Sequence, residues 1–546
     1  MVFNFSLPTT SHLSFQSRFS SPTHPSLPQS ASTARHALRQ SLKKHKRLTP
    51  AQRASHLPQV LAALNEYIPY VFALYRGLDS EEGGIEVVPG GAGTDIEPAW
   101  RPTLSSRSSL SLQRLKHRGR SARVAGCDLE FEIAFVLLTL GYVLSGLARA
   151  RYLSTLYSIK TPTTEEKTAA VTGAMKDLLT AASVHRYLAE SSTMSQLKAL
   201  SLSEEPSPSP SSAAAMTTRT TSTTATSSTS IAATTSTVAA TSSIPDLNPA
   251  MQSALASLAL AEATLLAVLK DDAYLTTCIQ ARNPQDKDWM VKAPDIPKVR
   301  ALLFARLCAR AAEYAEQAHA SASSVRAAGK ESKDKDEKTM EVDAEVLGYM
   351  RVLGRVARAK ACRFLAIDAE IGGRVGEGIA WLRAGRSALG IRTELEGDTP
   401  GGKEKKKERG LGFSKLKREW EERREERRVE KQAGLAKAGS DGGREADLDW
   451  GDDAGREEEA RVIDMLETKW MKMNEMVNTQ AIPSSTSFLS NLPSGRDIHS
   501  SPAPYVPPRL DEEQLARMRA PPDRSLSSED PGSSDEEDEP VRDGYY

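Results

Sequence analysis

Apolar residues recur at helical spacing along most of the chain, and the two most apolar stretches lie near its middle. Residues 249–270 place leucine and alanine on more than one side of a helix, which is typical of a helix buried by its neighbours. Residues 297–318 repeat this plan, with Leu303 and Leu307 one turn apart on one side. The pattern predicts a central helical pair. Either every apolar side of the second helix is buried in the core, or the side that carries Leu303 faces a binding partner.

The same spacing predicts further helices before and after this pair. They cover residues 32–47, 50–78, 128–157, 163–189, 342–370, 374–389, 413–431 and 457–476. The first two can form a hairpin, and small residues in the pair 342–370 and 374–389 are typical of TPR-like hairpins. Glycines and β-branched residues over 83–104 predict a small β-hairpin or an irregular loop. The predicted fold class is mostly α.

Composition divides the chain into parts that can and cannot form a core. Only 39% of the residues are hydrophobic, and long Ser/Thr, Lys/Glu and Pro tracts have too little apolar surface to fold. We therefore expect one helical domain over residues 1–481, with disordered insertions at about 191–247, 320–340, 396–410 and 434–455. Residues 482–546 are predicted to be a Pro-rich arm and an acidic disordered tail.

Charge and cysteine content narrow the class of protein. The chain carries 71 basic and 71 acidic residues, so no overall field favours nucleic acid or an acidic substrate. Four widely spaced cysteines suit reduced thiols in the cytoplasm, and the first residues lack the pattern of a secretory signal. The most membrane-like run, 133–148, is shorter than the about 20 residues that a bilayer requires, so we interpret it as a core helix.

Motifs for catalysis are not evident. The histidines do not stand at metal-ligand spacing, and neither a phosphate-binding loop nor a nucleophile elbow occurs, so we expect no metal, cofactor or catalytic residue. Cys308 and His319 could be imagined as a nucleophile pair, but nothing in the sequence orients the histidine. Binding is therefore the favoured activity.

Three segments outside the helices carry possible binding signals. The Ser- and Arg-rich residues 105–123 are interpreted as a solvated loop, with contact to phosphates or an acidic membrane as the alternative. In PYVPPR, Pro504, Pro507 and Arg509 have the PxxPxR form that can dock an SH3 domain, although an arm packed back on the domain fits equally well. The acidic end contains possible phosphorylation sites at Ser527, Ser533 and Ser534, or is a solubilising tail.

Two local motifs resemble helices of the BRO1-domain family. The run RVGEGIAWLRAGRSAL resembles that family's G-E-x-I-A-x-L helix through Gly376, Glu377, Ile379, Ala380 and Leu382. The run RLCARAAEY resembles a second BRO1 helix through Arg306, Leu307, Ala311, Ala312, Glu313 and Tyr314. The opening FNFSLPTTSHLSF, the helix order and the PYVPPRL arm are most similar to BRO1-domain proteins of fungal ambient-pH (Pal/Rim) signalling. The resemblance extends from residue 1 to about 510.

The resemblance implies an elongated, boomerang-shaped helical domain with a TPR-like middle and no enzymatic activity. BRO1 domains hold the C-terminal amphipathic helix of the polymer-forming ESCRT-III subunit against a hydrophobic patch. Alignment on RLCARAAEY puts the two aliphatic patch positions on Leu303 and Leu307. The aromatic patch position falls near Ala267 and Val268, where this chain has no aromatic ring.

The resemblance also implies a role in signalling. Such a protein is an adaptor that brings other Pal pathway components to ESCRT-III, at plasma-membrane or endosomal sites, when ambient pH is alkaline. The transcription factor PacC is then activated by a separate protease, and contact of the adaptor with the membrane is indirect. The alternative is a general TPR-like helical scaffold that acts through its Pro-rich and acidic tail.

Overall fold

The computed structural model describes residues 2–79, 84–90, 96–107, 123–157, 162–203, 244–280, 298–328, 340–391, 453–499 and 502–519. Its helices are α1 (Leu27–Arg47), α2 (Pro50–Asp79), α3 (Leu129–Leu156), α4 (Thr164–Ser203), α6 (Pro249–Asp271), α7 (Ala273–Gln280), α9 (Lys298–Ala328), α10 (Ala344–Ile371), α11 (Val375–Ala388), α13 (Arg456–Met473) and α14 (Glu512–Met518). The prediction of a mostly helical chain is confirmed. The predicted helix over 413–431 and the serines at 527, 533 and 534 lie outside the described residues.

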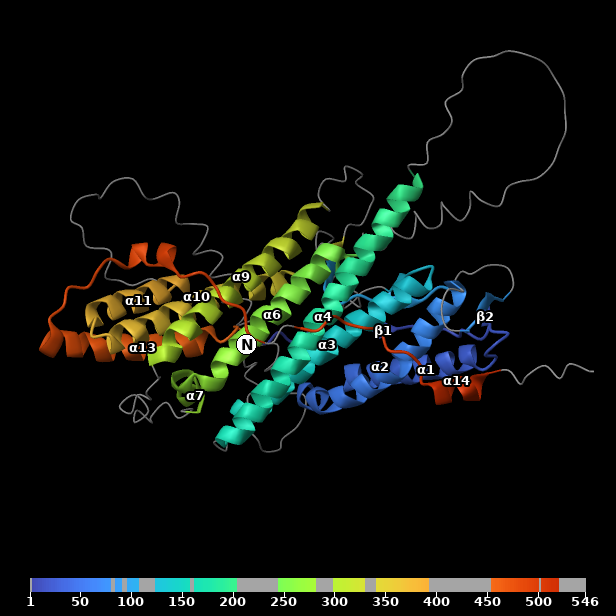
Figure 1. Cartoon of the computed structure of the whole chain (residues 1–546), viewed down its shortest axis with the longest axis horizontal. Helices are drawn as coiled ribbons and strands as arrows, with labels where there is room; N and C mark the ends of the chain where they lie inside the picture. The colour runs from blue at the N-terminus through green and yellow to red at the C-terminus, as the bar shows by residue number, and fades with distance from the viewer. Residues whose placement is uncertain are drawn as a thin grey trace, which may run out of the picture.

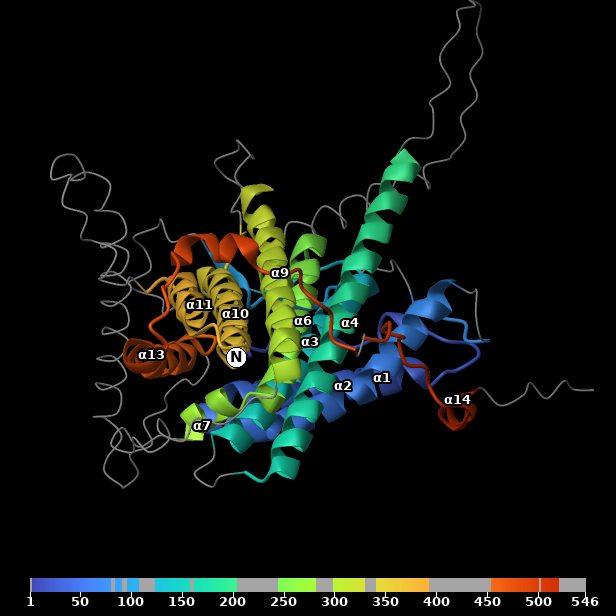
Figure 2. The same ribbon diagram turned by 60° about the vertical axis from the view of Figure 1, so that its left-hand side comes forward.

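The long helices form a row in which each packs against the next along the chain. The row runs from the α1–α2 hairpin through α3, α4, α6 and α9 to the α10–α11 hairpin and α13 (Figures 1 and 2). Helices α3 and α6 occupy its middle and are apolar on all sides. Both are long and apolar enough to cross a membrane, yet 89% of the most apolar window of each is buried by neighbouring elements. Residues 133–148 therefore lie in a core helix, as predicted.

A buried carboxylate connects the first helices to α3. Glu132 accepts hydrogen bonds from Arg35 of α1, from the Tyr67 hydroxyl of α2 and from the Trp100 indole, with the Arg35 Nε–Oε1 distance at 2.8 Å. Arg35 and Glu132 are 1% and 0% exposed. A buried ion pair stabilises a fold only when its remaining hydrogen-bonding groups are satisfied, and here the tyrosine and the tryptophan satisfy them.

The strands are short and link segments that are distant in the sequence. They are β1 (Thr9–Thr10), β2 (Phe19–Ser20), β3 (Val88–Pro89), β4 (Ala99–Arg101), β5 (Ser105–Arg107), β6 (Val124–Ala125) and β7 (Met340–Val342). The stretch 83–104 contains strands, as predicted, but β3 and β4 do not pair with each other. Antiparallel β3 pairs with β2, and β4 lies between β1 and β6. Hydrophobic alternation shows that a strand is present but does not identify its partner.

Several helices extend beyond their predicted ends. Helix α1 begins at Leu27 rather than at residue 32, with Pro28 in its first turn. Helix α4 runs to Ser203 and α9 to Ala328, so both enter ranges in which a disordered insertion is predicted. The reason is that Ser and Ala in these ranges oppose a helix only weakly, and a packed helix can propagate through them.

The N-terminal segment inserts into the middle of the row (Figure 1). Val2 is fully buried, and its carbonyl accepts a hydrogen bond from Arg149 of α3. The Phe3 amide donates to Glu262 Oε1 of α6 at 2.8 Å, and Phe5 stacks on Tyr142 at 4.5 Å between ring centroids. Phe3 and Phe5 thus anchor the N-terminal segment to the domain.

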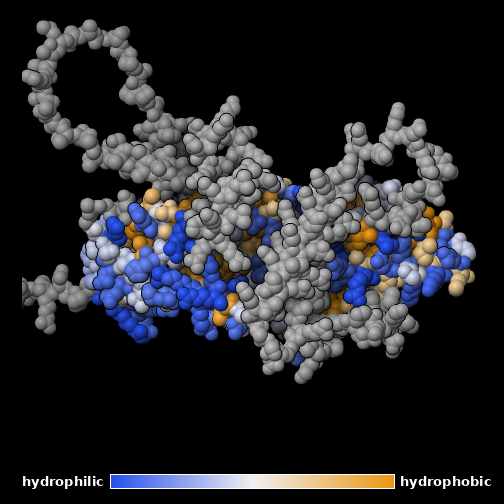
Figure 3. All heavy atoms as spheres, turned by 180° about the vertical axis from the view of Figure 1, so that it is seen from behind, coloured by the Kyte–Doolittle hydropathy of each residue, from blue (hydrophilic) through white to orange (hydrophobic). Residues whose placement is uncertain are grey.

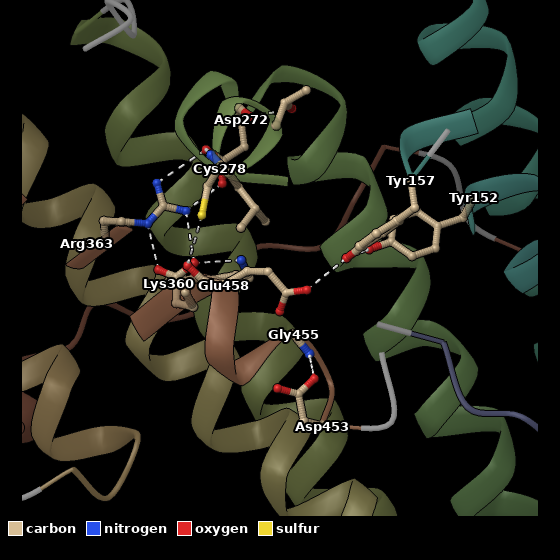
Figure 4. A network of polar contacts seen from close by, with 12 residues as sticks. Tyr152, Tyr157, Asp272, Cys278, Lys360, Arg363, Asp453, Gly455 and Glu458 are labelled. Carbon is tan, nitrogen blue, oxygen red and sulfur yellow. Dashed lines mark hydrogen bonds and ion pairs between the residues drawn. The ribbon is translucent and has the colours of Figure 1, made fainter. Parts of the chain in front are cut away.

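A buried ion cluster holds α13 against the row (Figure 4). Arg363 of α10 binds Glu459 of α13 at 2.6 Å and Asp272 at 2.5 Å, and Lys360 binds Glu459 at 2.7 Å. All four side chains are at most 2% exposed. Burial alone would raise the pKa of Asp272 and Glu459, but Arg363, followed by Lys360, outweighs it and lowers the pKa of both carboxyls.

Candidate partner-binding surface

The four residues predicted to form a partner patch lie on α6 and α9, which pack against each other near the middle of the row. Their exposure differs. Val268 is 1% exposed and Leu307 is 9% exposed, so both are core residues in this conformation. Leu303 and Ala267 are half-buried. Leu302, on a different side of α9, is 46% exposed and is the most exposed large apolar residue of that helix.

The α9 face that carries Leu303 and Leu307 continues into a polar site for the C-terminal strap, by which we mean residues 479–499 and 502–519. Backbone and side chain of Arg306 bind this strap: the Arg496 amide donates to the Arg306 carbonyl at 3.1 Å, and Arg306 Nε donates to the Ser494 carbonyl at 3.3 Å. Gly495 lies so close to α9 that an added Cβ would be 2.6 Å from Arg310 Cα. The strap therefore touches the helix backbone.

Four side chains complete this contact, which we call the α9 clasp: Arg310, Glu313, Tyr314 and Asp497. Asp497 accepts from Arg310 Nε and from the Tyr314 hydroxyl, each at 2.7 Å. Arg310 also binds Glu313 at 2.7 Å and lies 4.3 Å from the centroid of the Tyr314 ring. Hydrogen bonds from Tyr314 and Arg310 lower the pKa of Asp497, so the clasp holds a carboxylate.

The clasp is partly exposed, and this limits its strength. Arg310 and Asp497 are 32% and 62% exposed, and exposed ion pairs contribute about 0–1 kcal/mol each. The clasp is therefore a positioning contact that can open at modest cost.

The other BRO1-like motif, RVGEGIAWLRAGRSAL on α11, also contacts the strap. The Gly376 amide donates to Gln480 Oε1 at 3.0 Å, and a Cβ on Gly376 would lie 2.4 Å from the Ala481 carbonyl oxygen. Trp381 of α11 packs edge-on against Phe488 at 4.7 Å. In this chain Gly376 of one motif and Arg306, Glu313 and Tyr314 of the other thus contact the chain's own strap.

Beyond the clasp, the strap crosses α4 and ends beside the beginning of α1 (Figure 2). Tyr505 packs against Tyr187 of α4 at 5.4 Å, and residues 502–506 and α4 border a cavity of about 450 Å³. Pro504 and Arg509 of the SH3-type motif are exposed, Pro507 is half-buried and Leu510 is buried. In this conformation the PYVPPR segment therefore lies against the domain through Tyr505, and SH3 docking through Pro504, Pro507 and Arg509 stays a prediction.

The imagined nucleophile pair is not assembled. Cys308 is fully buried, and burial raises the pKa of its thiol far above the usual range. His319 lies eleven residues further along α9, roughly 16 Å at the helical rise, and its ring contacts Arg351. Among the described residues, no group of three or more His, Cys, Asp or Glu side chains could hold a metal ion.

A known protein matches the chain over its whole length. No protein-family model matches the chain. The pH-response regulator protein palC of Emericella nidulans is 49% identical over 558 aligned positions, which cover 100% of this chain and 97% of that protein. The chain belongs to the palC family of pH-response regulators. The relation to ambient-pH signalling proteins expected from the sequence is confirmed by this palC match.

Solved structures similar to the palC-family chain have low sequence identity. The BRO1 domain of ALIX in complex with CHMP4C is 13% identical with a TM-score of 0.45, over 92% of this chain and 96% of that one. A Bro1 domain described in connection with endosomal targeting is 14% identical with a TM-score of 0.42, over 95% of both chains. ALIX in complex with the SIVmac239 late domain is 14% identical with a TM-score of 0.48, over 93% of this chain and 49% of that one.

Sequence reasoning did not identify the partners of the motif residues. Asp497 and Gly495 stand in a polar stretch, NLPSGRD, without a helical or strand pattern. Their counterparts on α9 are separated from them by about 180 residues. Arg310, Glu313 and Tyr314 lie on one side of α9, but partly exposed polar side chains can be satisfied by water, so their spacing carried no clear signal of a partner.

Proposed function

We propose that this chain is a non-enzymatic adaptor of ambient-pH signalling that binds the C-terminal amphipathic helix of the polymer-forming ESCRT-III subunit. The main support is the full-length match at 49% identity to a pH-response regulator. The two BRO1-like motifs on α9 and α11 support the class of partner. By this proposal the adaptor acts in the cytoplasm, with other Pal components at plasma-membrane or endosomal ESCRT-III sites, and promotes proteolytic activation of PacC by a separate protease at alkaline pH.

The proposed docking surface is the α9 face with Leu303 and Leu307, bordered by Ala267 and Val268 of α6. An amphipathic helix binds through apolar residues placed one turn apart, and Leu303 and Leu307 match that spacing. Leu303 is half-exposed, so it can contact a partner without rearrangement. Leu307 and Val268 are buried, so their participation requires local movement of the neighbouring elements.

Leu303 and Leu302 lie on different sides of α9 and are both accessible, so substitutions at these two positions form a matched pair. Leu303→Asp removes an apolar contact from the proposed surface, whereas Leu302→Asp makes the same chemical change on another side of α9. Burial of a leucine contributes about 1.5–3 kcal/mol, so we expect Leu303→Asp to weaken binding about tenfold or more. Leu302→Asp should bind as tightly as the wild type. Calorimetric titration of the full chain with the partner's helical peptide measures both.

Circular dichroism and melting curves must show that both variants are folded. Leu307→Asp is unsuitable, because its burial predicts that the domain itself is destabilised. If the wild type does not bind the peptide, or if the two variants bind equally well, the proposal is wrong.

The alternative, a scaffold acting through its tail, is tested by a different truncation. Removal of residues 482–546 would also remove the strap, which packs on α11, α9 and α4. Removal of residues 520–546 leaves the described strap intact. The tail would be favoured as the binding site if the shorter truncation loses partner binding while Leu303→Asp binds like the wild type.

A further inference from the structure

Basic side chains are concentrated at the N-terminal end of the chain although the whole chain is neutral. The first 65 residues contain no Asp or Glu, and eight Lys or Arg residues: Arg18, Arg35, Arg39, Lys43, Lys44, Lys46, Arg47 and Arg53. Since basic and acidic residues are equal over the whole chain, this segregation creates a local field that the net charge conceals.

The fold brings most of these cations to one exposed end of the α1–α2 hairpin. Helix α1 buries its Leu38, Leu42 and His45 side. The register of a helix then turns Lys43, Lys44 and Arg47 outward, and all three are partly or fully exposed. Of the eight cations, only Arg35 is fully buried, where Glu132 binds it. The far side of the molecule, seen in Figure 3, is largely hydrophilic at the end where α14 and the beginning of α1 lie.

The turn between the two helices adds to the cluster. Arg53 of α2 donates to the carbonyls of Leu48 and Lys46, so it covers the C-terminal end of α1 with another cation. Arg123, just before β6, is exposed and lies close enough to Lys43 to act on its charge. We call Lys43, Lys44, Arg47, Arg53 and Arg123 the basic end.

The charged groups that affect Lys43, His45 and His56 at the basic end are all basic residues. Besides burial, the groups that lower the pKa of Lys43 are Arg39, Arg123 and Arg47. His45 is affected by His56 and Arg53, and His56 by Lys44. Within the described residues, Lys43, Lys44 and Arg47 form no ion pair with a carboxylate. Like charges held together without counterions favour an anionic partner.

We propose that the basic end binds the anionic phospholipid headgroups of a membrane surface directly. This inference does not depend on the adaptor function, and it replaces the indirect membrane contact that the resemblance implies with a direct one. Lysine and arginine side chains on an exposed helical end can approach a charged surface without a shaped pocket. A nucleic acid is less favoured, because single-stranded binding uses exposed aromatic rings and the exposed large apolar residues of the described chain include none.

Vesicle co-sedimentation of the full chain tests the proposal. The vesicles contain phosphatidylcholine alone, or phosphatidylcholine with about a quarter phosphatidylserine. Binding to the anionic vesicles alone is expected, and it should fall as salt rises from about 0.1 to 0.5 M because the screening length shortens. Equal binding to both vesicle types would overturn the proposal.

The triple variant Lys43→Glu, Lys44→Glu, Arg47→Glu removes the surface by charge reversal. Each cation near a membrane contributes about fivefold in partitioning, so we expect binding to fall about a hundredfold or more. The matched control reverses three exposed cations elsewhere, Arg355→Glu, Lys469→Glu and Lys472→Glu, with the same change in net charge. The control should bind like the wild type.

Two further readouts separate the possible outcomes. If the control loses as much binding as the triple variant, net charge and not the basic end is responsible, and the proposal is overturned. If a single-stranded oligonucleotide binds the wild type and anionic vesicles do not, the surface belongs to nucleic acid. The triple variant should still bind the ESCRT-III peptide, so failure of this inference and failure of the proposed function are distinguishable.

Discussion

Replacing Arg363 with Met tests whether the buried ion cluster holds α13 in place. The change preserves much of the side chain's apolar volume but leaves Asp272 and Glu459 buried without their main partner, and these carboxylates are 1% and 0% exposed. Lys360 still binds Glu459, so one negative charge is left uncompensated. Breaking such a pair costs about 3–5 kcal/mol, and we expect a loss of about 3 kcal/mol in the free energy of unfolding at neutral pH.

The effect should depend on pH in a direction that the structure fixes. In the wild type, Arg363 lowers the pKa of both carboxyls in the folded protein. The stability that the carboxylates contribute is therefore complete above the pKa values of the unfolded chain. It is lost as the pH falls through the lower pKa values of the folded protein. In the variant, burial raises the pKa, and a carboxyl can take up a proton. The difference in stability between wild type and variant should therefore shrink from pH 7 towards about pH 5.

Urea unfolding of the full chain, followed by circular dichroism, measures this difference. The matched control is Arg358→Met on the same helix, because Arg358 and Glu316 form a 2.6 Å pair whose side chains are 50% and 49% exposed. An exposed pair contributes less than about 1 kcal/mol. If the two variants lose the same stability, or if the Arg363→Met loss grows at acidic pH, the assigned role of the cluster is wrong.

Three further predictions concern the strap and two buried titrating groups. Gly495→Ala should loosen the strap and speed tryptic cleavage after Arg496, because its Cβ would meet the α9 backbone, whereas Gly348→Ala, which faces open space, should not. Burial raises the pKa of Glu262 from 4.5 to about 7. The wild type should therefore lose stability as the pH rises between these two values. In urea unfolding, the free energy of unfolding of Glu262→Gln relative to the wild type should then be higher at pH 8 than at pH 5. A lower relative value at pH 8 would contradict this assignment. Burial lowers the pKa of His45 to about 4 from 6.5, so an acid titration should show the wild type losing stability across this range and His45→Gln losing less.

The sequence predicted the helices well because each has a long periodic pattern. Helix α6 and the α10–α11 hairpin were predicted nearly at their observed bounds, with the turn at Gly373, whose φ of 77° suits glycine. The helix ends at Ser203 and Ala328 were missed, because serine and alanine give no clear stop signal. Strand partners were missed for a different reason: two- and three-residue strands contain too little pattern to define a register.

The surfaces were harder to predict than the helices. Periodicity placed Leu303 and Leu307 on one side of α9, but only the packed structure shows that Leu307 is buried while Leu302 is exposed. Likewise, the pairing of Asp497 with Arg310 joins residues that no local pattern connects. Burial and long-range pairing depend on how the helices pack, and a single sequence does not contain that information in readable form.

The inserted N-terminal segment imposes an order on synthesis. The Phe3 amide finds its acceptor on Glu262, which the ribosome adds 259 residues later. At about 5–20 residues per second, the segment must wait roughly 10–50 s before α6 exists to receive it. During that interval Val2, Phe3 and Phe5 are apolar groups without a core. The α1–α2 hairpin can form early from neighbouring residues, whereas the centre of the row closes around the first residues of the chain only after its middle has been made.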